Sequence, residues 1–220
     1  MRAGLVSLLV ALALAGCGEE RTGSGTASLW VTRDRGADVI HTGTVPAGIS
    51  ALEAIGRELD VETRYGGRFV QSIDGVHGSL ADQRDWFWYV NGLEGDTSAA
   101  EYRLHPGDVL WWDYRSWATQ MQVPVVVGAF PEPFLHGLGG EVPPAVVVGR
   151  SPVAAKLART IGGRVAPRAP PGANVLTIVP GRGFRAARNG DRVVFTVGAD
   201  DAPRLARNPG LARYRYEGLP

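Results

Sequence analysis

Residues that could take part in catalysis are present in this sequence, but their spacing does not suit catalysis. The four histidines are scattered at His41, His77, His105 and His136. No two of them have the spacing that places two metal ligands on one face of a helix. No serine stands in a Gly-x-Ser-x-Gly turn, and Asp82 and Asp85 are two carboxylates in a polar loop, where such groups are normally solvated. The sequence therefore predicts a protein that is not an enzyme and that needs neither a metal nor a cofactor.

An aromatic run, WFWYV, is typical of a β-strand that binds a flat apolar ligand. Strand alternation places Trp86, Trp88 and Val90 on one face and Phe87 and Tyr89 on the other. One of these faces must cover a helix, and the other is free to be open. Flat aromatic surfaces bind flat ligands by stacking and by burial of apolar area. The alternative is that these side chains belong to a core or to a covered sheet face.

The single cysteine, Cys17, follows an apolar run that is too short to span a membrane. Arg2 precedes the run and Leu-Ala-Gly leads into the cysteine, which fits a secretory signal with a small-residue cleavage site. These residues resemble the lipobox of bacterial lipoproteins. The resemblance implies a signal peptide over residues 1–16, a lipidated Cys17, and a flexible tether over residues 17–27. We expect an extracytoplasmic protein that is lipid-anchored to the bacterial cell membrane; an ordinary signal peptide with an incidental cysteine is the alternative.

Composition and charge exclude several classes of protein. A chain of 220 residues that is 45% hydrophobic and 20% charged is neither disordered nor fibrous. One cysteine cannot form an internal disulfide or a multi-thiolate metal site. The net charge of +1 conceals a −7 segment from Cys17 to Gln120 and a +7 segment from Met121 to Pro220. The basic segment is expected to dock on the acidic one, to meet an acidic partner or membrane, or simply to be solvated; no nucleic acid is expected outside the cytoplasm.

Residues 28–117 have the pattern of an α+β domain. Apolar periodicity predicts a helix over 49–59, where Ser50 and Glu53 form a capping box. Asn91-Gly92 and residues 105–108 have the composition of tight turns. A β-grasp-like mixed sheet crossed by one helix accounts for this order of elements. The strands are predicted over 28–33, 39–45, 68–73, 86–90 and 109–114.

Three motifs in this region occur in the order and at the spacing of a known family. They are RFVQSIDG over 68–75, WFWYVNG over 86–92 and AAEYRLHPGD over 99–108. Together they resemble the transcobalamin-like C-terminal domain family. In the animal vitamin B12 carriers of that family, this β-rich domain closes over cobalamin together with a separate α/α barrel.

The resemblance implies a ligand-binding site and partners. By motif position, Phe69, Trp88 and Leu93 match places where the carriers present apolar groups to the corrin, and Trp86 shares a face with Trp88. Cobalamin is thus the implied ligand, although no cofactor is required for folding. The sequence lacks the α/α barrel, so an α/α barrel protein is an expected partner, and a vitamin transporter is the expected recipient of the ligand.

Residues 123–220 have the pattern of a small α/β domain of no recognised family. Continuous apolar runs favour parallel strands buried on both faces. Ser151 and Pro152 predict the start of a helix that continues over 153–161, and Asp200 predicts the cap of a short helix that ends near Leu205. The strands are predicted over 123–128, 145–149, 174–179, 192–197 and 211–216.

Taken together, these patterns predict a cell-surface lipoprotein with a non-catalytic binding module. The module would hold cobalamin or another flat apolar ligand and pass it to a membrane transporter. The alternative is a structural or scaffold surface protein that uses the aromatic sheet face as a protein–protein interface. An open concave aromatic face would favour the first hypothesis, and a fully covered face would favour the second.

Overall fold

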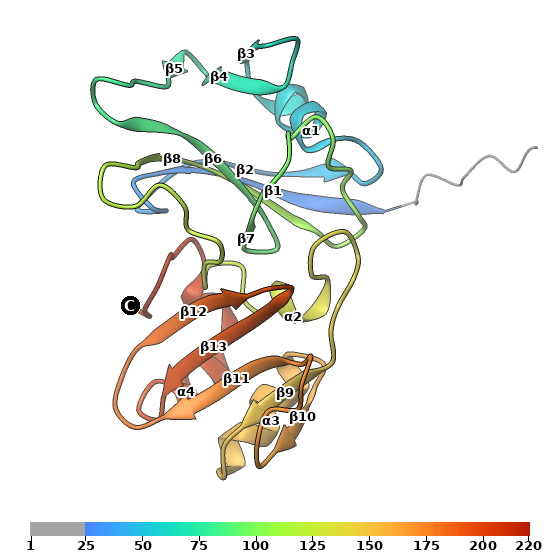
Figure 1. The fold of residues 1–220 in the computed structure, drawn as a ribbon, viewed down its shortest axis with the longest axis vertical. Coiled ribbons are helices and arrows are strands. Elements are labelled where there is room, and N and C mark those ends of the chain that lie inside the picture. The colour runs from blue at the N-terminus through green and yellow to red at the C-terminus, as the bar shows by residue number, and fades with distance from the viewer. Residues whose placement is uncertain (1–24) are drawn as a thin grey trace, which may run out of the picture.

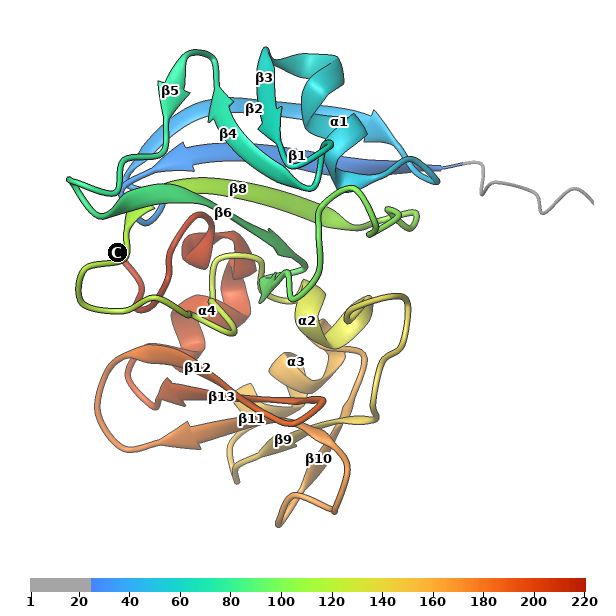
Figure 2. The same cartoon turned by 45° about the horizontal axis from the view of Figure 1, so that its top comes forward.

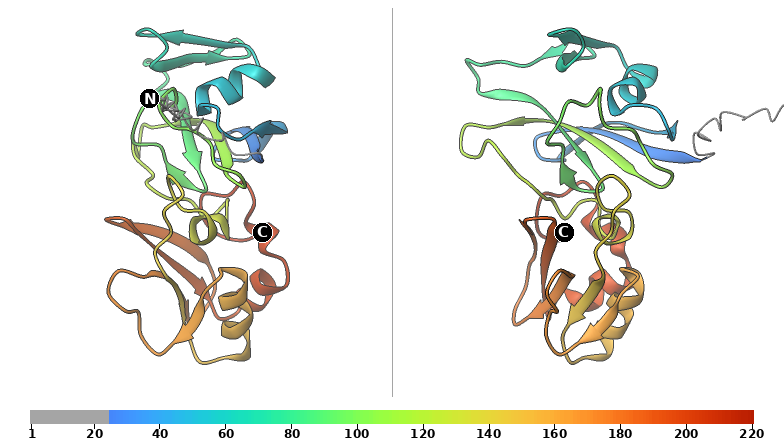
Figure 3. Two further views of the ribbon diagram at one scale, coloured as in Figure 1. Left: turned by 90° about the vertical axis from the view of Figure 1, so that its right-hand side faces the viewer. Right: turned by 45° about the vertical axis from the view of Figure 1, so that its right-hand side comes forward.

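The computed structural model describes residues 25–220, which form two sheet-based regions with few helices (Figure 1). The predicted α+β class is confirmed. The expected signal peptide, most of the expected tether and Cys17 lie outside the described residues. Within 25–220, no helix is both long enough and apolar enough to cross a bilayer. The two regions follow one another along the long axis of the molecule (Figure 3).

The first region is built on a mixed five-stranded sheet with the strand order β2-β1-β8-β6-β7. Strands β1 and β8 are parallel, and the other neighbours are antiparallel. Four of the five predicted strands are in this sheet with slightly wider bounds, and the sheet gains the short β7 after the Asn91-Gly92 turn. The fifth, predicted over 68–73, lies in a separate small sheet. The strands are β1 (Thr26–Arg33), β2 (Asp38–Pro46), β6 (Arg84–Val90), β7 (Leu93–Glu94) and β8 (Val109–Ser116).

One face of this sheet is covered by helix α1 (Ala51–Glu58) and by a small antiparallel sheet (Figure 2). The Ser50 side chain accepts a hydrogen bond from the backbone N–H of Glu53 at 3.0 Å, as the capping pattern predicts. The small sheet consists of β3 (Val61–Arg64), β4 (Phe69–Ile73) and β5 (Val76–His77). The core of this layer includes Leu29, Val31, Ile55, Ile73, Leu110 and Trp112.

The opposite face of the first sheet is covered by the second region. Tyr89 and Trp111 are fully buried there against Val126 and Tyr216. The face of β6 that carries Trp86 and Trp88 is therefore the face that α1 covers, and the face that carries Tyr89 is closed as well. Any opening to the aromatic residues lies instead at the outer edge of β6, where β7 pairs only with Tyr89 and Val90.

The second region is a five-stranded sheet with the order β10-β9-β11-β13-β12. Strands β10, β9, β11 and β13 are parallel, as the continuous apolar runs predict, and β12 adds an antiparallel edge. Ser151 caps α3 by accepting from the backbone N–H of Ala154. The strands are β9 (Ala145–Val148), β10 (Arg164–Ala166), β11 (Asn174–Val179), β12 (Phe184–Asn189) and β13 (Arg192–Gly198). The helices are α2 (Glu132–Leu135), α3 (Pro152–Thr160), α4 (Ala202–Arg207) and the 3₁₀ turn η1 (Pro209–Ala212).

The strand predicted over 123–128 is wrong. This segment has a single β-bridge, between Val125 and Leu93, and otherwise irregular backbone. It is apolar because it lies between the two regions: Val125 and Val127 pack into the core of the second region, whereas Val126 packs under the first sheet. A run buried on both sides gives the same sequence signal whether or not it joins a sheet.

Two predictions near the C-terminus are also corrected. Residues 211–216 form no strand; the chain leaves η1 through irregular backbone, and Tyr216 turns inward to pack beneath the first sheet. The short helix α4 follows Asp201 and not Asp200. The Asp201 carboxylate accepts from the backbone N–H of Gly183 at 2.8 Å, so it holds the β12 hairpin instead of capping the helix.

The Asn91-Gly92 turn is a structural feature and not a ligand contact. Both residues have positive φ, 52° and 81°, as a type I′ hairpin turn requires. The buried Asn91 amide donates to Asp108 Oδ1 at 2.7 Å and to the carbonyl of Gly137 at 2.8 Å, and its Oδ1 accepts from Val109 N at 2.8 Å. One side chain thus joins two turns of the first region to the loop after α2.

Replacing Asn91 with alanine should lower the free energy of unfolding by about 3 kcal/mol, because three buried hydrogen bonds are lost. Urea titration followed by circular dichroism measures the change. Asn189→Ala is the matched control, since that side chain is exposed, and it should change stability by less than about 0.5 kcal/mol. Equal costs for the two substitutions would contradict the role assigned to Asn91.

Candidate functional site

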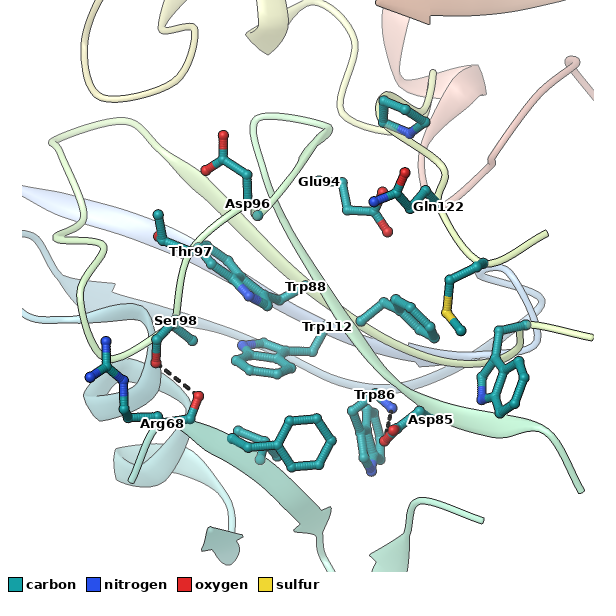
Figure 4. Close-up of a pocket in the computed structure, with 18 of the residues that line it drawn as sticks. Arg68, Asp85, Trp86, Trp88, Glu94, Asp96, Thr97, Ser98, Trp112 and Gln122 are labelled. Carbon is teal, nitrogen blue, oxygen red and sulfur yellow. Dashed lines mark hydrogen bonds between the residues drawn. The ribbon is translucent and has the colours of Figure 1, made fainter. Parts of the chain in front are cut away.

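An open cleft of about 610 Å³ lies beside the first sheet, and Figure 4 shows the side chains that line it. We call it the aromatic cleft. Its walls come from the start of β4, the outer part of β6, the loop after β7 over 94–99, and the segment that follows β8. Its aromatic lining residues are Phe69, Trp86, Phe87, Trp88, Trp112 and Trp117.

The indoles of the cleft are held in place by the sheet. Trp88 and Trp112 are paired across β6 and β8, with ring centroids 6.3 Å apart and planes inclined by 30°. The Trp86 indole N–H donates to the carbonyl of Val76 at 2.8 Å, which fixes that ring against β5. Trp112 is buried, whereas Trp88 is only half-buried. Trp117, which also lines the cleft, is half-buried too, so Trp88 and Trp117 are the indoles whose surfaces are available to a ligand, and Trp88 is the one that belongs to the sheet.

Gly95 lies directly against the Trp88 ring. A Cβ atom at this position would come within 2.1 Å of Cε2 of Trp88, a distance that no side chain could accept without movement. The Gly95 N–H donates to the carbonyl of Trp88 at 3.0 Å. The glycine thus lets the 94–99 loop lie flat against the indole and fix its orientation.

Five charged residues line the cleft, which are Arg68, Asp85, Glu94, Asp96 and Arg188, and two of the acids are in partly dry surroundings. Burial raises the pKa of Asp85, whose Oδ1 accepts from the backbone N–H of Trp86 at 2.8 Å. Burial also raises the pKa of Glu94, although Glu94 is 3.2 Å from Arg115 and accepts from the backbone N–H of Val123 at 2.8 Å. The cleft therefore combines an apolar floor with hydrogen-bond acceptors at its edges, which is typical of small-molecule sites.

Replacing Asp85 with asparagine should stabilise the folded protein at pH 7. The pKa of Asp85 is higher in the folded state than in the unfolded chain, so its ionised form opposes folding and protonation relieves the cost. The stability difference between variant and parent should shrink as the pH falls through the raised pKa towards the ordinary range of aspartate. Urea titrations at pH 7 and pH 4 measure it. Asp96→Asn, at an exposed position in the same cleft, should show no such gain.

The structure brings together three of the four ligand-binding residues expected from the sequence. Phe69, Trp86 and Trp88 all line the aromatic cleft. Leu93 does not: it is 6% exposed and packs beside Val125 in the core between the two regions. It lies one residue past the Asn91-Gly92 turn, where β7 points towards the second region.

Sequence reasoning missed Trp112 and Trp117 as lining residues. Trp112 could have been found, because alternation along the last predicted strand puts it on one face and Trp111 on the other. Trp117 and Met121 follow β8 in a segment that carried no pattern, and only the tertiary structure places them at the cleft. Among residues 25–220, no three His, Cys, Asp or Glu side chains are grouped so as to hold a metal ion.

Comparison with known proteins gives one family match and distant structural matches. None of the curated proteins matches the chain. A protein of Ruminococcus gnavus ATCC 29149, described provisionally as metal-binding, is 17% identical with a TM-score of 0.35, over 42% of this chain and 98% of that one. Haptocorrin in complex with Cbi is 17% identical with a TM-score of 0.36, over 42% of this chain; the matched part spans a quarter, 25%, of haptocorrin.

The family match covers the part of the chain that builds the floor of the cleft. The resemblance to transcobalamin-like domains that the motifs predict has only a distant structural similarity to haptocorrin beside it. Residues 48–116, from the turn before α1 to the end of β8, match the family described as a domain of unknown function (DUF4430).

Proposed function

We propose that this protein is a lipid-anchored, extracytoplasmic binding protein that holds a flat, largely apolar ligand in the aromatic cleft. A corrinoid is the first candidate, because the motifs over 68–75, 86–92 and 99–108 resemble the transcobalamin-like domain. The observation that carries the proposal is that four indoles line one open cleft of about 610 Å³, two of them, Trp88 and Trp117, only half-buried. That volume lies within the range of roughly 300–1,000 Å³ typical of small-molecule sites.

The arrangement of the aromatic residues supports a small ligand over a closed core. Trp88 is half-buried with Gly95 against its ring, and Phe69 remains 43% exposed beside it. A flat ligand placed between these two side chains would bury apolar area on both faces, and stacking would add to that gain. Its polar periphery would meet the carboxylates at the edges of the cleft.

Titration of the purified protein with cyanocobalamin, followed by tryptophan fluorescence, tests the proposal. Saturable quenching is expected, after correction for absorption with N-acetyltryptophanamide. Protoporphyrin IX, which is flat but lacks a corrin ring, distinguishes a general flat-ligand site from a corrinoid site. If neither compound quenches at high micromolar concentration, with and without an α/α barrel protein, the small-ligand proposal is wrong.

The lipid anchor and the transfer of ligand to a membrane transporter are parts of the same proposal, and the lipobox-like residues before Cys17 support them. Cys17→Ser should move the protein from the membrane fraction to the soluble or secreted fraction, because the lipid chains supply the membrane affinity. Mass spectrometry of the N-terminal peptide should find acyl groups on Cys17 of the parent. An unmodified cysteine in a membrane-bound parent would contradict the lipobox reading.

A protein–protein interface is the second candidate function, because large apolar side chains are exposed around the mouth of the cleft. Leu80 is 86% exposed, Tyr65 78% and Met121 54%. Such a cluster is common at interfaces. Sedimentation of the parent and of Leu80→Asp distinguishes the two candidate functions. Self-association of the parent that Leu80→Asp abolishes favours the interface. A parent that is monomeric and binds the flat ligand favours the small-molecule site.

A further inference from the structure

A second concave site lies at the other side of the contact between the two regions. It is a groove of about 400 Å³, which we call the arginine groove after Arg35, Arg185 and Arg215. It shares no lining residue with the aromatic cleft. The floor is formed by Val123, Val125, Ala186 and Tyr216, and the remaining lining residues are Gln120 and Glu217.

The position of Arg35 is fixed by the fold. It lies in the turn between β1 and β2 with a φ of 60°, and its backbone N–H donates to Asp113 Oδ2 at 3.2 Å. The same turn packs tightly on the C-terminal segment: a Cβ on Gly36 would come within 1.6 Å of the carbonyl oxygen of Tyr214. The Arg35 guanidinium lies 5.3 Å from the ring centroid of Tyr216. The groove therefore lies where the turn between β1 and β2 packs against the C-terminal segment.

The charge of the groove is not neutralised by the described part of the chain. Across residues 25–220, neither Arg35 nor Arg215 has a carboxylate within ion-pair distance, and Arg185 is 3.8 Å from Glu217 with both side chains exposed. The buried carboxylate beneath the groove, Asp113, is already engaged by the hydroxyls of Thr32 and Tyr216. The charged residues that line this concave site are therefore three arginines and one glutamate.

We propose that the arginine groove binds an anion of the phosphate type, with its guanidinium groups as the ligand-binding residues. Guanidinium groups match phosphate oxygens in pairs of hydrogen bonds. The apolar floor would accommodate an uncharged part of the ligand, and Gln120 supplies a neutral donor at the rim. The phosphate group has two sources at a cell surface, which are a soluble phosphorylated compound and the headgroup of an anionic lipid.

Calorimetric titration with pyrophosphate at low ionic strength tests the soluble source. Pyrophosphate has no aromatic surface, so its binding is independent of the aromatic cleft and of the function proposed for it. Arg35→Gln and Arg215→Gln should each weaken binding about tenfold or more, because each removes a charge-assisted hydrogen bond. Arg150→Gln is the matched control: it removes the same charge from an exposed loop position outside the groove and should leave binding within about twofold.

Co-sedimentation with vesicles tests the lipid source, in a Cys17→Ser background so that lipid chains do not anchor the protein. Binding to phosphatidylglycerol vesicles but not to phosphatidylcholine vesicles, lost in Arg35→Gln and Arg215→Gln, identifies the headgroup as the ligand. Pyrophosphate binding with the same dependence identifies a soluble phosphate. The proposal is overturned if neither probe binds, or if Arg150→Gln weakens binding as much as the groove variants.

Discussion

Arg115→Ala should lower the free energy of unfolding by about 3–5 kcal/mol. The Arg115 side chain is fully buried, and its guanidinium lies 3.5 Å from the ring centroid of Phe87. It donates to the carbonyls of Gln120 and Met121, both at 2.9 Å, and to Glu94 at 3.2 Å. Removing it leaves two carbonyls and a partly buried carboxylate without their partner.

The loss of stability in Arg115→Ala should come mainly from the unpaired Glu94 carboxylate and from the released segment after β8. Adding Glu94→Gln to Arg115→Ala should therefore recover part of the lost stability, since no charge is then left buried. Arg57→Ala, which breaks an exposed ion pair with Glu53 at 2.8 Å, is the control and should cost less than about 1 kcal/mol. Urea titration measures all of these changes. A loss below about 1 kcal/mol for Arg115→Ala would show that the network adds no stability.

Trp88→Ala should weaken binding of the flat ligand about thirtyfold or more, because truncation of a central aromatic contact typically costs about 2 kcal/mol or more. Trp88 is the half-buried indole that the sheet contributes to the cleft, and its loss removes both the stacking surface and the ring on which Gly95 rests. Gly95→Ala should weaken binding as well, since the new Cβ must displace the ring that it would otherwise meet at 2.1 Å.

Trp30→Ala is the matched control for the Trp88 experiment. Trp30 also lies in the first sheet, but it packs with Trp111 and Tyr214 on the face away from the cleft. Its replacement should leave ligand affinity unchanged while lowering stability. Calorimetry is the appropriate measurement, because each variant also changes the tryptophan fluorescence. Equal losses of affinity in the two variants would mean that the ligand does not bind at the aromatic cleft.

The elements that the sequence predicted well are those whose signals are local. The N-cap at Ser50, the Ser151-Pro152 helix start and the Asn91-Gly92 turn depend on contacts within a few residues, and each is present. The predicted strands with strong apolar or aromatic runs are present for the same reason, except the one over 123–128. The other half of the predicted capping box is not formed, because the Glu53 carboxylate accepts from Arg57 at 2.8 Å. Strand β12, with the sequence FRAARN, was missed because it has little β-propensity of its own and is held by pairing along β13.

The segments that were predicted wrongly are apolar for tertiary reasons. Residues 123–128 read as a strand because they are buried on both sides, and the burial comes from the contact between the two regions. Leu93 was placed at the ligand by motif position, but the same contact puts it in a core. An apolar run indicates that a segment is buried, but it does not indicate which part of the molecule buries it.

The sequence alone determined the α+β class, the parallel character of the second sheet and the positions of the tight turns. It also pointed to Phe69, Trp86 and Trp88 as residues of one site. Only the tertiary structure decided that both faces of the first sheet are covered and that the aromatic residues line a cleft at the outer edge of β6. It also decided that Arg35, Arg185 and Arg215, 180 residues apart in sequence at their widest, meet in one groove. The physical reason is that propensity and periodicity act over a few residues, whereas a cleft or a groove forms where distant segments pack imperfectly against one another.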